Sequence, residues 1–303
     1  MIMKYFKRLT AEDVVMDVII AVIMVGLVIV TLYPFINVIA VSFNSAIDSV
    51  RGGITVWPRV FTLYNYSHIL SNREIYYSAF ISISRTIIGT VFSLMMCIPL
   101  AYILSKQNFV FRKQFTVFMM LTMYFSGGII PTYFLYRSLG LINSFAVYII
   151  PGLISAWNVV VIRSYIEGLP ISLQESATID GASDLLILLK IIFPLITPVT
   201  ATIALFCAVA QWNSWFDTYI YASGSQSLST LQFELMKTLS SASMNLSGNV
   251  AYSGNQSLLS RISITPASIR ATMTVVATIP ILIVYPFLQK YFVTGMVLGG
   301  VKE

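Results

Sequence analysis

Residues 175–195 read ESATIDGASDLLILLKIIFPL, a short polar segment followed directly by an apolar run. Ser172 and Glu175, at the start of this segment, have the spacing of a capping box, in which a hydroxyl and a carboxylate satisfy the free backbone donors of a helix start. We therefore predict a short helix that begins near Leu173. A charged, capped helix in the middle of so apolar a chain marks a point where the chain leaves its apolar surroundings.

The predicted helix ends at a glycine turn. Gly181 can adopt the left-handed backbone conformation that closes a helix, and Ser183 with Asp184 can cap the helix that follows. This second helix runs on into the apolar stretch. Residues 168–190 are therefore predicted to form an elbow, which consists of a short helix, a sharp turn and a second helix.

The composition of the chain indicates that lipid surrounds most of it. Of the 303 residues, 57% are hydrophobic and only 10% are charged, whereas a soluble domain carries about a quarter charged residues. The 18 basic and 12 acidic residues are too few to give a soluble chain of this length a polar surface. The basic residues are scattered between apolar segments rather than aligned on one helix, so no nucleic-acid partner is expected.

The hydropathy pattern predicts an all-α polytopic membrane protein with six transmembrane helices. About 20 apolar residues cross a bilayer, and the first apolar run is too long for a secretory signal peptide. An even number of spans places both termini on one side, and flanking basic residues identify that side as the cytoplasm by the positive-inside rule. The predicted spans are 18–41, 79–104, 115–136, 143–163, 191–219 and 270–293. The flanking basic residues are Lys4, Lys7, Arg8, Lys106, Arg112 and Lys113.

The spans divide the chain into three parts. Residues 1–75 form the first helix and an outer segment, residues 76–293 form the transmembrane core, and residues 294–303 form a cytoplasmic tail. The core includes a long polar outer loop at 220–269. Cys97, Cys207 and the one histidine, His68, have neither disulfide nor metal-ligand spacing, so no metal or catalytic site is expected.

The elbow resembles the signature of the permease subunits of ATP-binding-cassette (ABC) importers. The residues on that pattern are Glu175, Ala177, Asp180, Gly181, Ala182 and Pro194, and Ser176 replaces its middle alanine. The resemblance implies the transmembrane fold of type I importers, in which the elbow docks into a cleft of a cytoplasmic ATPase. The coupling residues that it implies are Ser172, Leu173, Glu175, Ser176, Ala177, Ile179, Asp180, Gly181, Ala182 and Ser183. Leu173, Ala177 and Ile179 would supply apolar surface; the alternative is an amphipathic connector on the lipid interface.

Other stretches resemble the carbohydrate-importer branch related to maltose permeases, in particular the group that serves complex oligosaccharides. They are FSGGIIPTYFLYRSLGLINSF, QWNSWFDTYIY and QKYFVTGMVLGGVKE. The resemblance implies a bacterial plasma-membrane importer with a second permease, two copies of an ATPase and an extracellular or lipid-anchored solute-binding protein. No glycine here precedes a lysine, so the P-loop pattern is missing and ATP with Mg is expected on the partner ATPase.

Aromatic and polar residues gather at the end of the fifth predicted span, as expected of a sugar path. Sugars present flat apolar faces and a rim of hydroxyls, which rings with neighbouring amides and carboxylates complement. Trp212, Trp215 and Tyr219 recur at helical spacing and are expected on one face. The path candidates are Trp212, Asn213, Trp215, Asp217 and Tyr219, with a second set of Tyr124, Tyr133, Tyr136 and Asn143. The alternative is an aromatic belt at the membrane interface.

A second hypothesis is an ion-driven secondary transporter. Such transporters carry ionisable groups inside the membrane that bind the coupling ion, and Arg85 and Asp217 are the nearest candidates here. Internal repeats, which are common in that class, are not apparent. A membrane enzyme is disfavoured because the sequence offers no nucleophile–base or metal-binding set.

Overall fold

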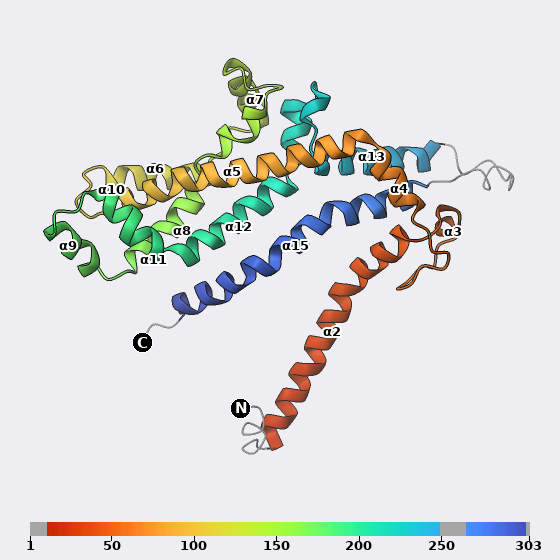
Figure 1. The fold of residues 1–303 in the computed structure, drawn as a ribbon, viewed down its shortest axis with the longest axis horizontal. Coiled ribbons are helices and arrows are strands. Elements are labelled where there is room, and N and C mark those ends of the chain that lie inside the picture. Colours follow the sequence, from red (N-terminus) through yellow and green to blue (C-terminus); the bar gives the residue numbers. More distant parts are fainter. Residues whose placement is uncertain (1–10, 249–264, 301–303) are drawn as a thin grey trace. The chain divides into compact units, whose positions relative to one another are not determined.

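The computed structural model describes residues 11–248 and 265–300, and these residues are mostly helical (Figure 1). They form two compact units. The first unit comprises the described residues up to Ser71 together with those of Thr238–Val276, and the second comprises Asn72–Lys237 together with those from Ala277 onward. Of the predicted flanking residues, Lys4, Lys7 and Arg8 lie outside the described residues.

In the first unit, the long helix α2 (Ala11–Ser42) leads into a small polar segment with α3 (Ala46–Val50) and α4 (Tyr64–Ser71). Buried asparagines hold this segment together. Asn65 Nδ2 donates to the carbonyl oxygens of Ser42 and Asn44, both at 2.9 Å, and Asn44 Oδ1 accepts from the Val60 backbone NH. The side-chain amides thus satisfy backbone groups that no helix or sheet pairs.

In the second unit, helix α5 (Arg73–Ser105) packs against α8 (Ala156–Glu167) and α12 (Thr197–Asn213) (Figure 1). The buried side of α5 includes a run of small residues at every fourth position, whereas many of its large apolar side chains are exposed. Small residues allow helix backbones to approach closely, which is how helices associate in lipid. The buried run contains Gly89, Ser93, Cys97 and Ala101.

The remaining elements of this unit are shorter. They are α6 (Arg112–Tyr124), α7 (Ile129–Ser138), η2 (Phe145–Tyr148), η3 (Ile150–Gly152), α9 (Ser172–Ile179), α10 (Asp184–Ile187), η4 (Leu188–Ile192), α11 (Phe193–Leu195), η5 (Thr218–Ala222) and η6 (Gln226–Leu228). Helix α13 (Leu231–Gly248) lies within the predicted outer loop, and α15 (Pro266–Gly300) follows it; both helices belong partly to each unit.

Among the residues that the structure describes, three helices are long and apolar enough to cross a membrane: Glu12–Ser42, Arg73–Ser105 and Pro266–Val284. The other three predicted spans fall on pairs of helices that meet at bends of 118°, 42° and 81°, so the described residues hold up to six spans if each bent pair is one. The sharpest bend follows Phe125 and includes Gly128, whose φ is +83°, and the 81° bend precedes Pro198. Glycine and proline are the usual causes of such breaks.

Candidate functional site

The elbow ends its first helix in the predicted way. Gly181 has a φ of +79°, the left-handed conformation that glycine adopts without steric cost. The Ala182 NH donates to the Ala177 carbonyl at 3.0 Å, and the Gly181 NH donates to the Thr178 carbonyl at 3.1 Å. These two bonds form a Schellman motif, which fixes the direction in which the chain leaves α9.

The predicted capping box is wrong. Ser172 is already the first helical residue, and the position before it, Ile171, has helical dihedrals and no side-chain cap. The Leu173 NH donates to the Pro170 carbonyl, so the helical turn begins before Ser172. This backbone bond satisfies a donor that a serine cap would otherwise accept. Ser183 does precede α10 in an extended conformation, but its hydroxyl makes no capping bond.

Most of the elbow residues are exposed. Ile179 is 85% exposed and Leu173 is 40% exposed, while Glu175, Ser176 and Asp180 are also on the surface. Ala177 differs from the prediction, because it is buried in the main apolar core instead of contributing to the surface. The elbow is therefore attached to the core at Ala177, Ile187 and Leu188, and it displays Leu173 and Ile179. The other elbow candidates are Ser172, Gly181 and Ser183, which are exposed, and Ala182, which is partly buried.

Ion pairs brace the end of the helix group at which the elbow lies (Figure 1). Lys106, just after α5, pairs with Asp184 at the start of α10. Burial is the largest single influence and lowers the pKa of Lys106, but the contacts with Asp184 and Tyr102 together outweigh it and raise this pKa above its usual value. Glu167 Oε1 accepts from Arg112 Nη2 at 2.6 Å and from Arg163 Nε at 2.8 Å, which joins α6 to α8.

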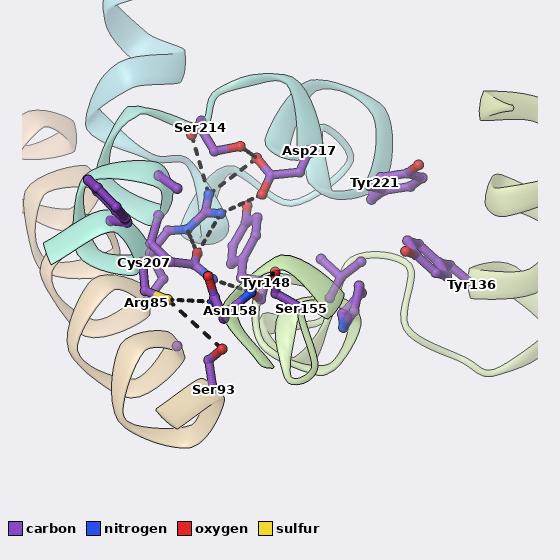
Figure 2. Close-up of a pocket in the computed structure, with 17 residues that line it drawn as sticks. Arg85, Ser93, Tyr136, Tyr148, Ser155, Asn158, Cys207, Ser214, Asp217 and Tyr221 are labelled. Carbon is purple, nitrogen blue, oxygen red and sulfur yellow. Dashed lines mark hydrogen bonds and ion pairs between the residues drawn. The ribbon is translucent and has the colours of Figure 1, made fainter. Parts of the chain in front are cut away.

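A second site surrounds Arg85, deep in the same unit (Figure 2). The Arg85 side chain is only 2% exposed, and all five of its N–H donors have acceptors. Asp217 receives two of these bonds, Nη1 to Oδ1 at 3.2 Å and Nη2 to Oδ2 at 2.5 Å. Gln211 Oε1 receives two, at 3.1 and 2.9 Å, and the Ser214 carbonyl receives the fifth at 3.3 Å.

Neighbouring groups hold this ion pair in place. The Tyr148 ring lies 4.3 Å from the Arg85 guanidinium carbon, a cation–π contact, and the Tyr148 hydroxyl donates to the Leu228 carbonyl at 2.7 Å. Asp217 Oδ1 also accepts from the Ser214 hydroxyl, at 2.9 Å. A charge this deep is retained only when it is paired and hydrogen-bonded, and both conditions are met here.

The Arg85–Asp217 pair borders a cavity of about 490 Å³. This volume lies in the range of small-molecule sites, about 300–1,000 Å³. Its wall combines rings with neutral polar groups (Figure 2). The lining residues that carry a polar side chain or an aromatic ring are Arg85, Ser93, Tyr136, Tyr148, Ser155, Asn158, Phe206, Cys207, Gln211, Ser214, Asp217 and Tyr221.

Two of the predicted path residues, Asp217 and Tyr136, line this cavity. Tyr133 and Tyr219 line a neighbouring cavity of about 430 Å³, and Trp215 contacts Tyr219 at a ring-centroid distance of 6.3 Å. The expected single helical face is wrong, because the α-helix ends at Asn213 and Ser214 is extended.

The other predicted path residues lie elsewhere. Trp212 is buried and its Nε1 donates to the Ala277 carbonyl at 3.0 Å, which makes it a packing residue. Asn213 accepts a bond from Gln232, and Tyr124 is almost fully exposed at the end of α6. Asn143, with a φ of 56°, shapes the backbone through its NH bond to the Tyr221 carbonyl at 2.8 Å.

Several cavity residues were not among the predicted candidates, notably Tyr148, Asn158, Ser93 and Tyr221. Ser93, Tyr148 and Asn158 stand in none of the quoted motifs, whereas Tyr221 is the last residue of QWNSWFDTYIY. The sequence feature that could have pointed to this cavity is Arg85. It is a charged residue inside an apolar run, and such a residue requires a buried partner.

Comparison with known proteins identifies the family. The family model described as "Binding-protein-dependent transport system inner membrane component" matches residues 78–298. The polygalacturonan/rhamnogalacturonan transport system permease protein YtcP of Bacillus subtilis (strain 168) is 36% identical over 269 residues, which cover 89% of this chain and 92% of that protein. Protein LplC of the same strain is 35% identical over 274 residues, 90% of each chain.

Similarity to a solved structure supports the same family. A chain of a bacterial ABC transporter involved in the import of the acidic polysaccharide alginate superposes with a TM-score of 0.81 at 30% identity, covering 94% of this chain and 99% of that one. The protein is thus a multi-pass component of the cytoplasmic membrane that takes part in transport and is not an enzyme. With a family model matched over most of its length and relatives aligned almost end to end, this chain belongs to the family of binding-protein-dependent transport system inner membrane components, the permease subunits of ABC transporters.

Proposed function

We propose that this chain is one of two permease subunits of an ATP-driven importer of complex oligosaccharides. The names of its relatives support a carbohydrate substrate, since they concern the transport of polygalacturonan, rhamnogalacturonan and alginate. In this proposal the partners are a second permease, two copies of a cytoplasmic ATPase, and an extracellular or lipid-anchored solute-binding protein. ATP and Mg belong to the ATPase, and this chain contributes the path and the mechanical link.

The proposed topology has six spans with both termini in the cytoplasm. Each bent helix pair then counts as one span, which gives six with the three long helices. The positive-inside rule supports this orientation, because the elbow end of the helix group carries Lys106, Arg112, Lys113 and Arg163. The elbow therefore lies in the cytoplasm, where an ATPase can reach it.

The observation that carries the proposal is the exposed helix α9 on a rigid turn. A coupling element must present apolar side chains to its partner and must also pass force to the bundle without deforming. Ile179 and Leu173 meet the first need, since both are exposed. The Schellman motif at Gly181 and the buried Ala177 meet the second, because they fix α9 to the core.

Capture of the tagged chain from its native membrane tests the proposal. Wild-type protein is expected to retain a second permease and an ATPase, identified by mass spectrometry. Ile179→Asp should lose the ATPase selectively, because burying one isoleucine contributes about 1.5–3 kcal/mol, which corresponds to more than tenfold in affinity.

Val110→Asp is the matched control. Val110 is 81% exposed, close to the 85% of Ile179, and lies in the connection between α5 and α6 rather than in the elbow. This variant should keep the ATPase. Equal loss in both variants would exclude the elbow as the specific docking element, and the absence of any ATPase from wild-type protein would exclude the importer itself.

A further inference from the structure

The cavity beside the Arg85–Asp217 pair has no cation to offer an anionic ligand. Among the described residues that line it, Arg85 is the one with a positive charge, and its five donors are already used within the protein. The Tyr148 ring covers one face of its guanidinium group. Arg85 therefore acts as a strut that holds α5 to the segment after α12, and it is not free to bind a carboxylate.

The acidic side of the pair is the more accessible one. The side chain of Asp217 is 24% exposed, against 2% for Arg85. Oδ1 of Asp217 already accepts from Arg85, Ser214 and Thr218, whereas among the described residues Oδ2 accepts only from Arg85. A carboxylate oxygen has about two acceptor sites, so Oδ2 keeps one position for a donor such as a sugar hydroxyl. A ligand carboxylate at this place would instead meet a like charge.

The remaining wall suits an uncharged sugar ring. Tyr136 and Tyr221 form a tyrosine pair, with ring centroids 4.9 Å apart and planes inclined at 58°. Figure 2 shows this pair on a different side of the cavity from Ser93 and Cys207. Aromatic rings match the apolar face of a sugar, and neutral hydroxyl and amide groups match its rim.

We propose that this cavity binds an uncharged, hydroxyl-rich sugar ring of the transported oligosaccharide, with the tyrosine pair against the apolar face of the ring and Asp217 Oδ2 accepting from one of its hydroxyls. The proposal rests on the proposed function as a carbohydrate importer. It assigns the selection against a carboxylate at this position to Asp217, and it makes Arg85 a positioning residue. If the transported oligosaccharide also contains acidic rings, their carboxylates must be paired with positive charges that lie outside this cavity.

The native cysteines allow a direct test in the captured complex. Cys207 lines the cavity and is partly exposed, whereas Cys97 is fully buried and serves as the internal reference. The rate at which methyl methanethiosulfonate labels each thiol is followed by mass spectrometry of the peptides. Ser155→Cys, at another lining position, supplies a second reporter.

The probes are a trimer of α-1,4-linked galacturonate and its carboxyl-reduced counterpart, the trimer of galactose, which differ only at C6. The galactose trimer is expected to protect Cys207, and at about ten times its Kd labelling should slow about tenfold because only the free fraction reacts. The galacturonate trimer should protect much less. Tyr221→Ala should raise the concentration of galactose trimer needed about tenfold, whereas Tyr76→Ala, at an exposed tyrosine outside the lining, should not.

Two results would overturn the inference. One is protection by the galacturonate trimer equal to or better than that by the galactose trimer. The other is the absence of protection by either trimer at both reporter positions. If the complex still contains its ATPase in these cases, only the sugar site fails and the importer stands; a complex without ATPase refutes the proposed function instead.

Discussion

Replacement of Asp217 by asparagine should destabilise the protein strongly, although the two side chains have nearly the same shape. The change leaves the Arg85 charge in place, 2% exposed and without its counter-charge. Breaking a buried ion pair by removing one partner costs about 3–5 kcal/mol. We expect the lower end, about 3 kcal/mol, because Gln211 and the Ser214 carbonyl still accept from Arg85 and the Tyr148 ring still covers it.

The assay is thermal unfolding of the solubilised complex. At about 2–4 °C per kcal/mol for a unit of this size, Asp217→Asn should lower Tm by about 6–12 °C. Arg85→Gln should cost less, since it leaves a carboxylate that is 24% exposed and can be reached by water. The double variant removes both charges and should regain most of the loss.

The double variant is the decisive comparison. The reasoning requires that Asp217→Asn acts by leaving a buried charge unpaired, and not by disturbing a shape. A double variant that melts as low as Asp217→Asn alone would refute it. A Tm for Asp217→Asn within about 2 °C of the wild type would also refute it, because a loss of under about 1 kcal/mol is the value for an exposed pair.

Two glycine substitutions, each with a second glycine substitution as its control, give further tests. Gly89→Ala would place a methyl group 2.7 Å from Gln211 Nε2, so Gln211, which accepts from Arg85, must shift; we expect a loss of about 1–3 kcal/mol in the free energy of unfolding, read as a lower Tm. Gly26→Ala, with nothing within 4 Å, should leave Tm unchanged or slightly raised. Gly181→Ala strains a φ of +79° by about 1–2 kcal/mol and should weaken ATPase capture. Gly140→Ala imposes similar strain at a φ of +68° outside the elbow and should not weaken that capture.

The elbow was largely predictable because its determinants are local. The residues that form the first helix, the left-handed glycine and the start of the second helix lie close together in the sequence, and Gly181 adopts the expected conformation. What failed was the choice between equivalent local solutions. A serine hydroxyl could have accepted a backbone NH at the start of α9. In the structure, the Leu173 NH donates to the Pro170 carbonyl instead, and the sequence alone does not show which of these two bonds forms.

The cavity was not predictable to the same degree because its residues meet only in three dimensions. Arg85 and Asp217 are 132 positions apart, and Gln211 is 126 positions from Arg85. Helical spacing after α12 also failed, since the extended Ser214 interrupts the period on which the placement of Trp212 with Tyr219 depended. Composition could indicate that aromatic and polar residues gather here, but not which of them share a wall.

The arrangement of Arg85 and Asp217 also bears on what drives transport. An ion-driven transporter needs an ionisable group whose partner is the coupling ion, so that arrival of the ion changes its charge balance. Arg85 and Asp217, the two candidates for that role, are instead paired with each other, and Arg85 has no donor left. An ion that bound Asp217 would compete with the buried Arg85 for the same carboxylate. The pair is therefore better suited to hold α5 against the segment after α12, and in the proposed function the force of transport enters elsewhere, at the exposed elbow.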